Sequence, residues 1–150
     1  KRLGENIKIQ NFPEEGTEGG YTVTVPSLPG CVTYGDTIEE AINMAREAIQ
    51  LYIESLKAHG EEIPTEDGVL EYTLTIRPMP KLPPLSPEKI TNLLKKKGFV
   101  LDRTKGSHQI YFNPTTGKRV VVPFHKKDLP KGTLLEILRQ AGISKEELKK

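Results

Sequence analysis

Apolar and polar residues alternate in four short stretches of the first half of the chain. The stretches lie at residues 7–9, 21–25, 32–34 and 70–76. Alternation with a period of two is typical of strands with one buried face, so four strands are predicted. A glycine-rich segment separates the first two stretches, and we therefore expect these two strands to pair as a hairpin.

Between the third and fourth strands, apolar residues recur with the spacing of a helix from Ile38 to Leu56. Thr37 and Glu40 form a capping box that starts this helix, and Gly60 ends it. The element order is thus β-β-β-α-β, a single sheet with one helix packed across it. We interpret the acidic residues of the helix as mostly its solvated face, and these are Asp36, Glu39, Glu40, Glu47 and Glu54.

The second half shows the same two periodicities in another order. A helix begins at the N-cap residue Ser86 and ends before Gly98, and a second helix ends at Gly142. Three strand candidates lie between them, at residues 99–102, 109–112 and 119–123. The order α-β-β-β-α predicts one small sheet with both helices on one face. The chain as a whole is expected to be α+β, with two small domains.

A proline-rich segment, residues 78–85, separates the two halves. Prolines interrupt helices and central strands, so this segment is expected to be an extended, fairly stiff linker between domains at 1–77 and 86–150. Residues 1–80 contain 6 Lys and Arg against 14 Asp and Glu, a net charge of −8, whereas residues 81–150 contain 16 against 6, a net charge of +10. The basic half predicts a nucleic-acid partner, and the acidic half is the nearest candidate to cover it.

Composition narrows the class of protein. No run of about 18 apolar residues is present and the first residues do not resemble a secretory signal, so we expect a cytoplasmic protein without a membrane partner. Cys31 is the only cysteine, and its apolar and turn-forming neighbours indicate a small buried residue rather than a reactive thiol. No histidines or carboxylates have ligand spacing, so neither a metal nor a cofactor is expected.

The candidate chemistry lies in the run R-T-K-G-S-H, where His108 stands between a basic turn and a strand. Imidazole has an unperturbed pKa near neutrality, so His108 beside Arg103 and Lys105 is suited to proton transfer in phosphodiester cleavage. The alternative is a histidine at the start of a strand that makes an ordinary hydrogen bond. The residues alone leave both interpretations open.

The run G-F-V-L-D-R-T-K-G-S-H-Q-I-Y-F-N-P, followed by R-V-V-V-P-F-H and L-P-K-G-T-L-L-E-I-L-R-Q-A-G-I-S, resembles the HicA toxin family over residues 86–148. The resemblance implies a small, metal-independent endoribonuclease that cuts mRNA and has a double-stranded-RNA-binding-like fold. It implies that His108 is the catalytic residue. His125, in the V-P-x-H motif, has either a second proton-transfer or phosphate-binding role or a structural one. The implied RNA-binding residues are Arg103, Lys105, Ser107, Lys126 and Lys131.

A second resemblance covers residues 6–77, where G-G-Y-T-V-T-V-P-S-L-P-G-C-V-T-Y-G-D-T-I-E-E-A-I-N-M-A-R-E-A-I is similar to the N-terminal domain of HicB antitoxins. The N-terminal domains of that family resemble a partial ribonuclease H fold. Here no carboxylates cluster on the strands, so this half is better interpreted as an inhibitor than as a nuclease. The toxin-like half also occupies the place of the DNA-binding domain of full antitoxins, so operator DNA is not an expected partner.

Together the resemblances imply a toxin-antitoxin protein of the stress response, fused in one chain. The HicB-like domain would inhibit the HicA-like domain either within the chain or across a domain-swapped homo-oligomer. The alternative is a non-catalytic RNA-binding or scaffold protein that retains the toxin fold. The intact R-x-K-G-S-H motif favours the ribonuclease.

Overall fold

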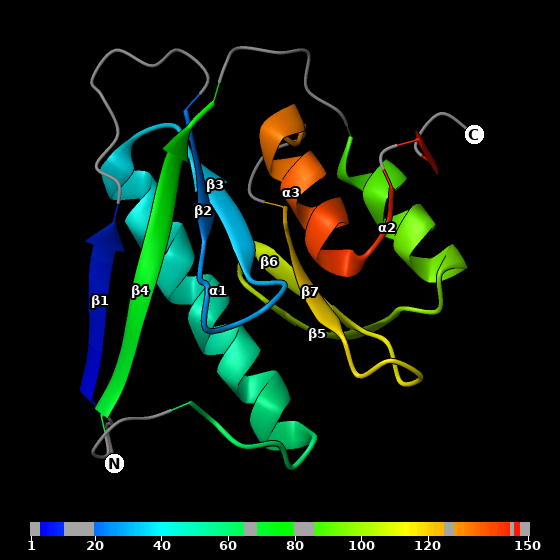
Figure 1. The fold of residues 1–150 in the computed structure, drawn as a ribbon, viewed down its shortest axis with the longest axis horizontal. Coiled ribbons are helices and arrows are strands. Elements are labelled where there is room, and N and C mark those ends of the chain that lie inside the picture. Colours follow the sequence, from blue (N-terminus) through cyan, green and yellow to red (C-terminus); the bar gives the residue numbers. More distant parts are fainter. Residues whose placement is uncertain are drawn as a thin grey trace.

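The computed structural model describes residues 4–10, 20–64, 69–79, 86–124, 128–144 and 146–147. Within these residues the chain forms two sheets and three helices, so the predicted α+β architecture of two small domains is confirmed (Figure 1). The elements in chain order are β1 (Gly4–Gln10), β2 (Tyr21–Thr24), β3 (Val32–Gly35), α1 (Ile38–Ala58), β4 (Val69–Pro78), α2 (Pro87–Lys96), β5 (Val100–Lys105), β6 (His108–Phe112), β7 (Arg119–Pro123) and α3 (Lys131–Ala141).

The first domain, β1 to β4 with α1, has a four-stranded sheet in the order β1-β4-β2-β3. The predicted hairpin between the first two strands is wrong, because β1 pairs in parallel with β4. The physical reason is that both edges of β2 are already occupied. One edge pairs antiparallel with β3 and the other antiparallel with β4, so only the far edge of β4 is open to β1.

Helix α1 crosses this sheet and packs its apolar stripe on it. The Thr37 side chain accepts a hydrogen bond from the Glu40 N–H, and the Glu40 carboxylate accepts one from the Asp36 N–H, so the predicted cap is confirmed. Ala45, Ile49 and other residues of the stripe are fully buried against alternate residues of β2 and β4. Each large side chain buried in this way contributes roughly 1.5–3 kcal/mol.

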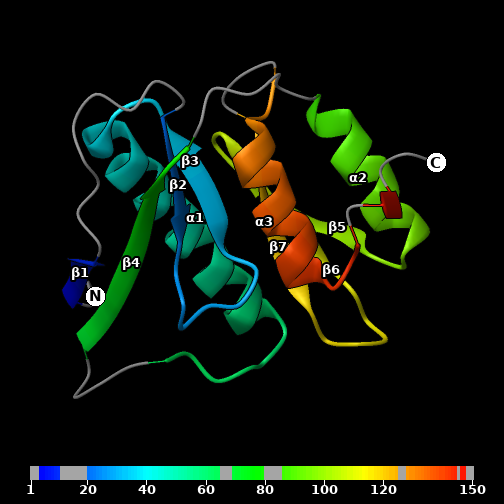
Figure 2. The same cartoon turned by 45° about the horizontal axis from the view of Figure 1, so that its top comes forward.

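The second domain, α2 to α3 with β5 to β7, has an antiparallel sheet in the order β5-β6-β7. All five residues of β7 are buried, which means that both faces of this strand are covered. Val120 and Val122 pack with α2 and α3, whereas Val121 and Ile110 belong to the apolar cluster that contains α1. The sheet is therefore enclosed between its own helices and the first domain (Figures 1 and 2).

A direct backbone contact joins the domains where β3 runs beside β7 (Figure 2). The Gly30 carbonyl accepts a hydrogen bond from the Val121 N–H at 2.8 Å, and the Gly30 N–H donates to Gln140 Oε1 at 2.5 Å. Gly30 has a φ of +90°, and a Cβ there would overlap the carbonyl oxygen of Arg119. Glycine is required for this approach. The adjacent Cys31 is buried, as predicted, and burial raises the pKa of its thiol to about 12.

The expected linker begins inside the fold. Pro78 ends β4, and Met79 is buried and donates its N–H to the Gly20 carbonyl at 2.9 Å. The remainder of the predicted linker, residues 80–85, lies outside the described residues. Among the helices of the described ranges, none combines the length and the apolar character needed to cross a bilayer.

Candidate functional site

His108 is the first residue of β6, and its side chain projects from the same sheet face as that of Ile110, toward α1. The residue is 0% exposed. It follows a tight turn in which Gly106 has a φ of +53°, a conformation that favours glycine. The sequence motif thus places the histidine at the centre of the contact between the two domains.

Both ring nitrogens of His108 bond to residues of the first domain. Nδ1 lies 2.7 Å from Oε1 of Glu47 on α1, and Nε2 lies 2.8 Å from Oγ1 of Thr33 on β3. A carboxylate only accepts, so Nδ1–H donates to Glu47, and in the neutral ring Nε2 then accepts from the Thr33 hydroxyl. The ring is held in one tautomer and one orientation by two elements of the neighbouring domain.

Burial lowers the pKa of His108 below its usual 6.5, and the hydrogen bond and negative charge of Glu47 offset only part of this shift. The imidazole is therefore neutral at pH 7. A neutral ring whose Nε2 is an acceptor has the protonation state of a general base. In this arrangement, however, Nε2 already accepts a hydrogen bond from the Thr33 hydroxyl and is not open to a proton from a substrate.

The carboxylate of Glu47 also bonds to the turn before His108. Its Oε1 accepts the Ser107 N–H at 2.6 Å, and a Cβ at Gly106 would overlap its Oε2. Glu47 and Glu54 were expected on the solvated face of α1. The expectation is wrong for Glu47, which bonds to the second domain, whereas Glu54 remains 40% exposed. Both face the second domain, because helical periodicity identifies the stripe that packs on the helix's own sheet but not a second surface that packs on a neighbour.

Two of the basic residues predicted to bind RNA, Lys105 and Arg103, lie close to Glu54 of α1. Lys105 Nζ is 2.8 Å from Glu54 Oε2, and Arg103 Nη1 is 4.0 Å from Glu54 Oε1. Both basic side chains are a little over one-third exposed. Arg103, Lys105, Ser107 and His108 thus all lie on the side of the second domain that contacts α1.

The other predicted site residues lie elsewhere. Lys131 is the exposed first residue of α3, and no described hydrogen bond or ion pair joins it to the group around His108. His125 and Lys126 fall outside the described residues.

A second polar cluster between the domains escaped the sequence analysis. Asp102 of β5 accepts from Ser55 at 2.7 Å and from His59 at 2.9 Å, and Arg119 forms a bidentate ion pair with Glu61. Although burial raises the pKa of Asp102, its hydrogen bonds with Ser55 and His59 outweigh that effect and hold the pKa below the ordinary value. His59, the C-cap residue of α1, gave no sequence signal of this contact, because its partner lies 43 positions later in the chain.

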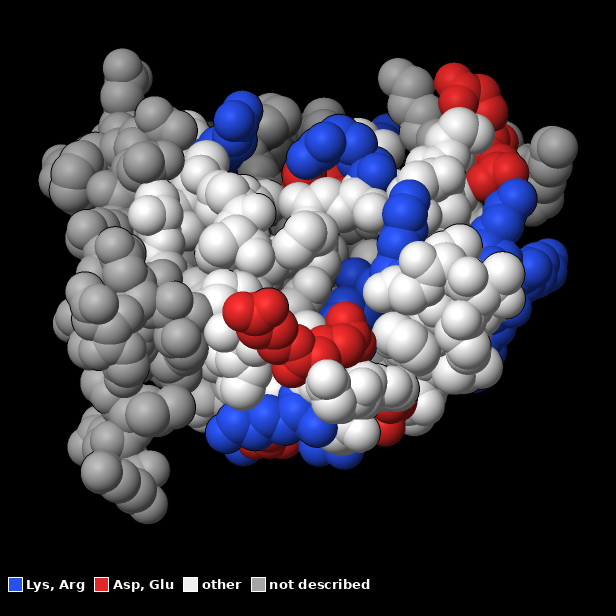
Figure 3. All heavy atoms as spheres, turned by 60° about the horizontal axis from the view of Figure 1, so that its bottom comes forward, with Lys and Arg blue, Asp and Glu red and all other residues white. Residues whose placement is uncertain are grey.

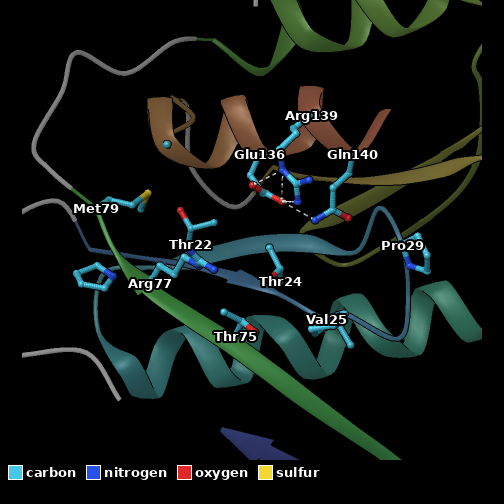
Figure 4. A pocket seen from close by; sticks show the side chains of 13 residues that line it. Thr22, Thr24, Val25, Pro29, Thr75, Arg77, Met79, Glu136, Arg139 and Gln140 are labelled. Carbon is cyan, nitrogen blue, oxygen red and sulfur yellow. Dashed lines mark hydrogen bonds and ion pairs between the residues drawn. The ribbon is translucent and has the colours of Figure 1, made fainter. Parts of the chain in front are cut away.

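Outside the contact between the two domains, charged side chains of both signs are mixed on the surface. On the face drawn in Figure 3, acidic and basic side chains lie in small neighbouring groups rather than in one broad basic area. A hollow of about 870 Å³ lies between β2, β4 and α3, away from His108. Thr22, Thr75, Arg77 and Arg139 are among its lining residues, and Arg139 is held by Glu136 (Figure 4).

These features define a class of protein built from two complementary modules, in which one module covers a histidine-containing basic surface of the other. Comparison with protein families identifies both modules. Residues 9–76 match the HicB-like antitoxin of bacterial toxin-antitoxin systems, and residues 88–143 match the HicA toxin of bacterial toxin-antitoxin systems. The chain belongs to these families as a fusion of antitoxin and toxin, which confirms both resemblances.

Several individual relatives match about a third of the chain, and one of them is named as an antitoxin. A UPF0150 protein of Thermoplasma acidophilum is 54% identical over 51 residues, which are 34% of this chain and 74% of that protein. A UPF0150 protein of Synechocystis is 48% identical over 58 residues, 39% of this chain and 73% of that protein. Antitoxin HicB 1 of Photorhabdus laumondii is 41% identical over 61 residues, 39% of each chain.

Proposed function

We propose that this toxin-antitoxin protein is a metal-independent endoribonuclease that cuts mRNA and is held inactive by its own antitoxin domain. One observation supports the proposal above all others. The side chain of the motif histidine, His108, is fully buried, and both of its ring nitrogens bond to antitoxin residues. An RNA strand cannot reach this ring until the domains separate.

The chemistry follows from the needs of RNA cleavage. The 2′-oxygen forms a bond to phosphorus, the bond from phosphorus to the 5′-oxygen breaks, the 2′-hydroxyl loses a proton and the leaving 5′-oxygen gains one. His108 performs one of these two proton transfers, a contribution of about 10²- to 10⁴-fold. His125 is the candidate for the other transfer or for a phosphate contact.

Binding of the substrate rests on the basic residues of the toxin domain. Arg103 and Lys105 lie on β5 and Ser107 in the turn before His108, and we assign Lys126 and Lys131, the first residue of α3, as further cations for the RNA strand. Phosphate contacts of this kind supply most of the affinity for a nucleic acid and make it depend on salt. An mRNA substrate also places the activity in the cytoplasm.

Inhibition follows from the pairing of the functional units 1–77 and 86–150. The acidic antitoxin domain docks on the basic toxin domain within one chain, and tethering gives an effective concentration of up to about millimolar. A swapped homo-oligomer would make the same contacts between two chains. Because the toxin domain stands in place of a DNA-binding domain, binding to operator DNA is not part of this function.

The test uses residues 86–150 expressed alone, with and without His108→Ala. We expect growth arrest and RNA cleavage from the unchanged fragment. His108→Ala should abolish cleavage but lower RNA affinity by less than about tenfold, because most of that affinity comes from Lys and Arg contacts to phosphate. Cleavage that survives His108→Ala would move the chemistry to His125. A fragment that binds RNA without cutting it would instead favour a non-catalytic RNA-binding protein.

A further inference from the structure

We propose that α1 inhibits the toxin by imitating RNA, with the carboxylates of Glu47 and Glu54 standing where two phosphate groups of the strand bind. The inference rests on the proposed function and deepens it, because it assigns a phosphate site to the turn that contains Gly106 and Ser107. In this assignment Ser107 contributes its backbone N–H rather than its hydroxyl. The ligand class is a single RNA strand that presents successive phosphates.

The first site is defined by the donors that converge on Glu47. Oε1 of Glu47 accepts from the Ser107 N–H at 2.6 Å and from His108 Nδ1 at 2.7 Å. A backbone N–H and an imidazole N–H aimed at one anionic oxygen form the kind of donor set that also binds a phosphate oxygen. Because His108 is the proposed catalytic residue, the phosphate bound here is the one that is cut.

The absence of a side chain at Gly106 supports this assignment. The second oxygen of Glu47 occupies the space that a Cβ of residue 106 would fill. The φ of Gly106, +53°, also disfavours other residues. Glycine is thus used where an anion approaches the backbone closely, and a tetrahedral phosphate requires at least as much room as a carboxylate.

The second site is defined by the cations around Glu54. Lys105 Nζ lies 2.8 Å from one oxygen of this carboxylate, and Arg103 Nη1 lies 4.0 Å from the other. Glu47 and Glu54 are seven residues apart on α1, two helical turns or about 10 Å along the axis. This separation is too large for two oxygens of one phosphate, so the two carboxylates represent two different phosphates of the strand.

The two sites differ in exposure, and the difference assigns them separate roles. His108 is fully buried beneath Glu47, whereas Lys105 and Arg103 are more than one-third exposed beside Glu54. The Glu47 position therefore selects and orients the reacting phosphate. The Glu54 position attracts a neighbouring phosphate through charge that remains partly hydrated.

The first experiment measures anion binding to the full chain carrying Glu47→Ala, with inorganic phosphate as the probe. Removing the carboxylate leaves the donors of Ser107 and His108 without their acceptor, so phosphate should bind there. We expect a saturable shift of the Ser107 amide resonance and a rise in Tm beyond that caused by sodium chloride of equal ionic strength. The unchanged chain and Glu39→Ala, which removes an exposed carboxylate from the same helix, should show neither effect.

The second experiment measures binding of a 2′-O-methyl oligoribonucleotide, which lacks the attacking 2′-hydroxyl. The full chain with Glu47→Ala and Glu54→Ala should bind it at least about tenfold more tightly than the unchanged chain. The matched control, Glu39→Ala with Glu62→Ala, changes the net charge equally at exposed positions and should gain far less. If Glu47→Ala does not fold, Glu54→Ala is tested alone against Glu39→Ala, and a gain in oligoribonucleotide affinity over that control is still expected.

Equal affinities for the two double variants, or no phosphate-dependent change at Ser107, would overturn the phosphate assignment. Neither experiment requires cleavage. If both probes bind at these positions but residues 86–150 alone cut no RNA, the nuclease is refuted and the phosphate site stands. A protein that cuts RNA without binding phosphate at Ser107 would refute the phosphate site and leave the nuclease standing.

Discussion

The centre and the border of the interface use the same pairing of acid with base but differ in burial. At the centre, His108 is 0% exposed between Glu47 and Thr33. At the border, Lys105 and Glu54 are 38% and 40% exposed. A buried donor left without a partner costs about 1–3 kcal/mol, whereas an exposed ion pair contributes about 0–1 kcal/mol. The centre therefore holds the domains in register, and the border mainly guides their approach.

The largest effect should come from a substitution that pushes the two domains apart and so disturbs the centre and the border together. In Gly30→Ala, a Cβ would overlap the Arg119 carbonyl, whereas at Gly60, which also has a positive φ, nothing lies within 4 Å of an added Cβ. Both variants carry the left-handed conformational cost of about 1–2 kcal/mol. Gly30→Ala should lose a further 1–3 kcal/mol or so from overpacking, measured by urea unfolding. Equal losses in the two variants would mean that this close approach contributes nothing.

The next largest loss of stability should come from a substitution at the centre alone, beside His108. Glu47→Ala removes the acceptor of both the Ser107 N–H and His108 Nδ1, so we expect a loss of about 2–4 kcal/mol in the free energy of unfolding. Glu39→Ala, on the exposed face of α1, should stay within about 1 kcal/mol of the unchanged chain. If the two variants are equally stable, the centre is no stronger than an exposed ion pair.

Acid should weaken the centre through His108. Its pKa is lowered in the folded chain, so the unfolded state binds more protons once the pH falls below about 6.5, and stability drops from there toward the lowered pKa. Above 6.5 this histidine contributes no pH dependence. The slope should reach at most about 1.4 kcal/mol per pH unit.

The His108→Asn variant provides the control for this slope. Asp102 and Glu61 also have lowered pKa values, and their stabilising contribution is lost at lower pH, as each is protonated. The variant should keep that acid loss and lack the component that begins near pH 6.5. An unchanged profile in His108→Asn would assign the whole pH dependence to the carboxylates.

The smallest loss of stability should come from a substitution at the border alone, at Glu54. Glu54→Gln removes the charge that faces Lys105 and Arg103, and it should cost less than about 1 kcal/mol in unfolding measurements. In 1 M salt, where the Debye length is about 3 Å, the difference from the unchanged chain should disappear. A loss that persists in 1 M salt would show that this pair acts as a desolvated contact like that of Glu47.

The elements of the fold could be predicted because their signals are local. Alternation marked β2, helical periodicity and the Thr37 cap marked α1, and the G-S-H motif marked His108. The pairing of β1 with β4 could not be predicted, since it depends on which strand edges remain open after the rest of the sheet has formed.

The same limit applied to the site. Glu47 looked like an ordinary solvated residue, because its partner lies 61 positions later in the chain and on another domain. The charges of −8 and +10 on the two halves indicated that the halves would meet. They did not identify the residues that would do so.

Cutting the connection between the domains tests most directly whether the antitoxin domain silences His108 within one chain. A protease site placed within residues 80–84 allows RNA cleavage to be compared before and after cutting, at decreasing protein concentration. The uncut chain should stay nearly silent at every dilution, because tethering maintains a high effective concentration, whereas the cut chain should gain activity as its halves separate. Activity that appears on dilution of the uncut chain would indicate a swapped oligomer. An uncut chain as active as residues 86–150 alone would contradict autoinhibition.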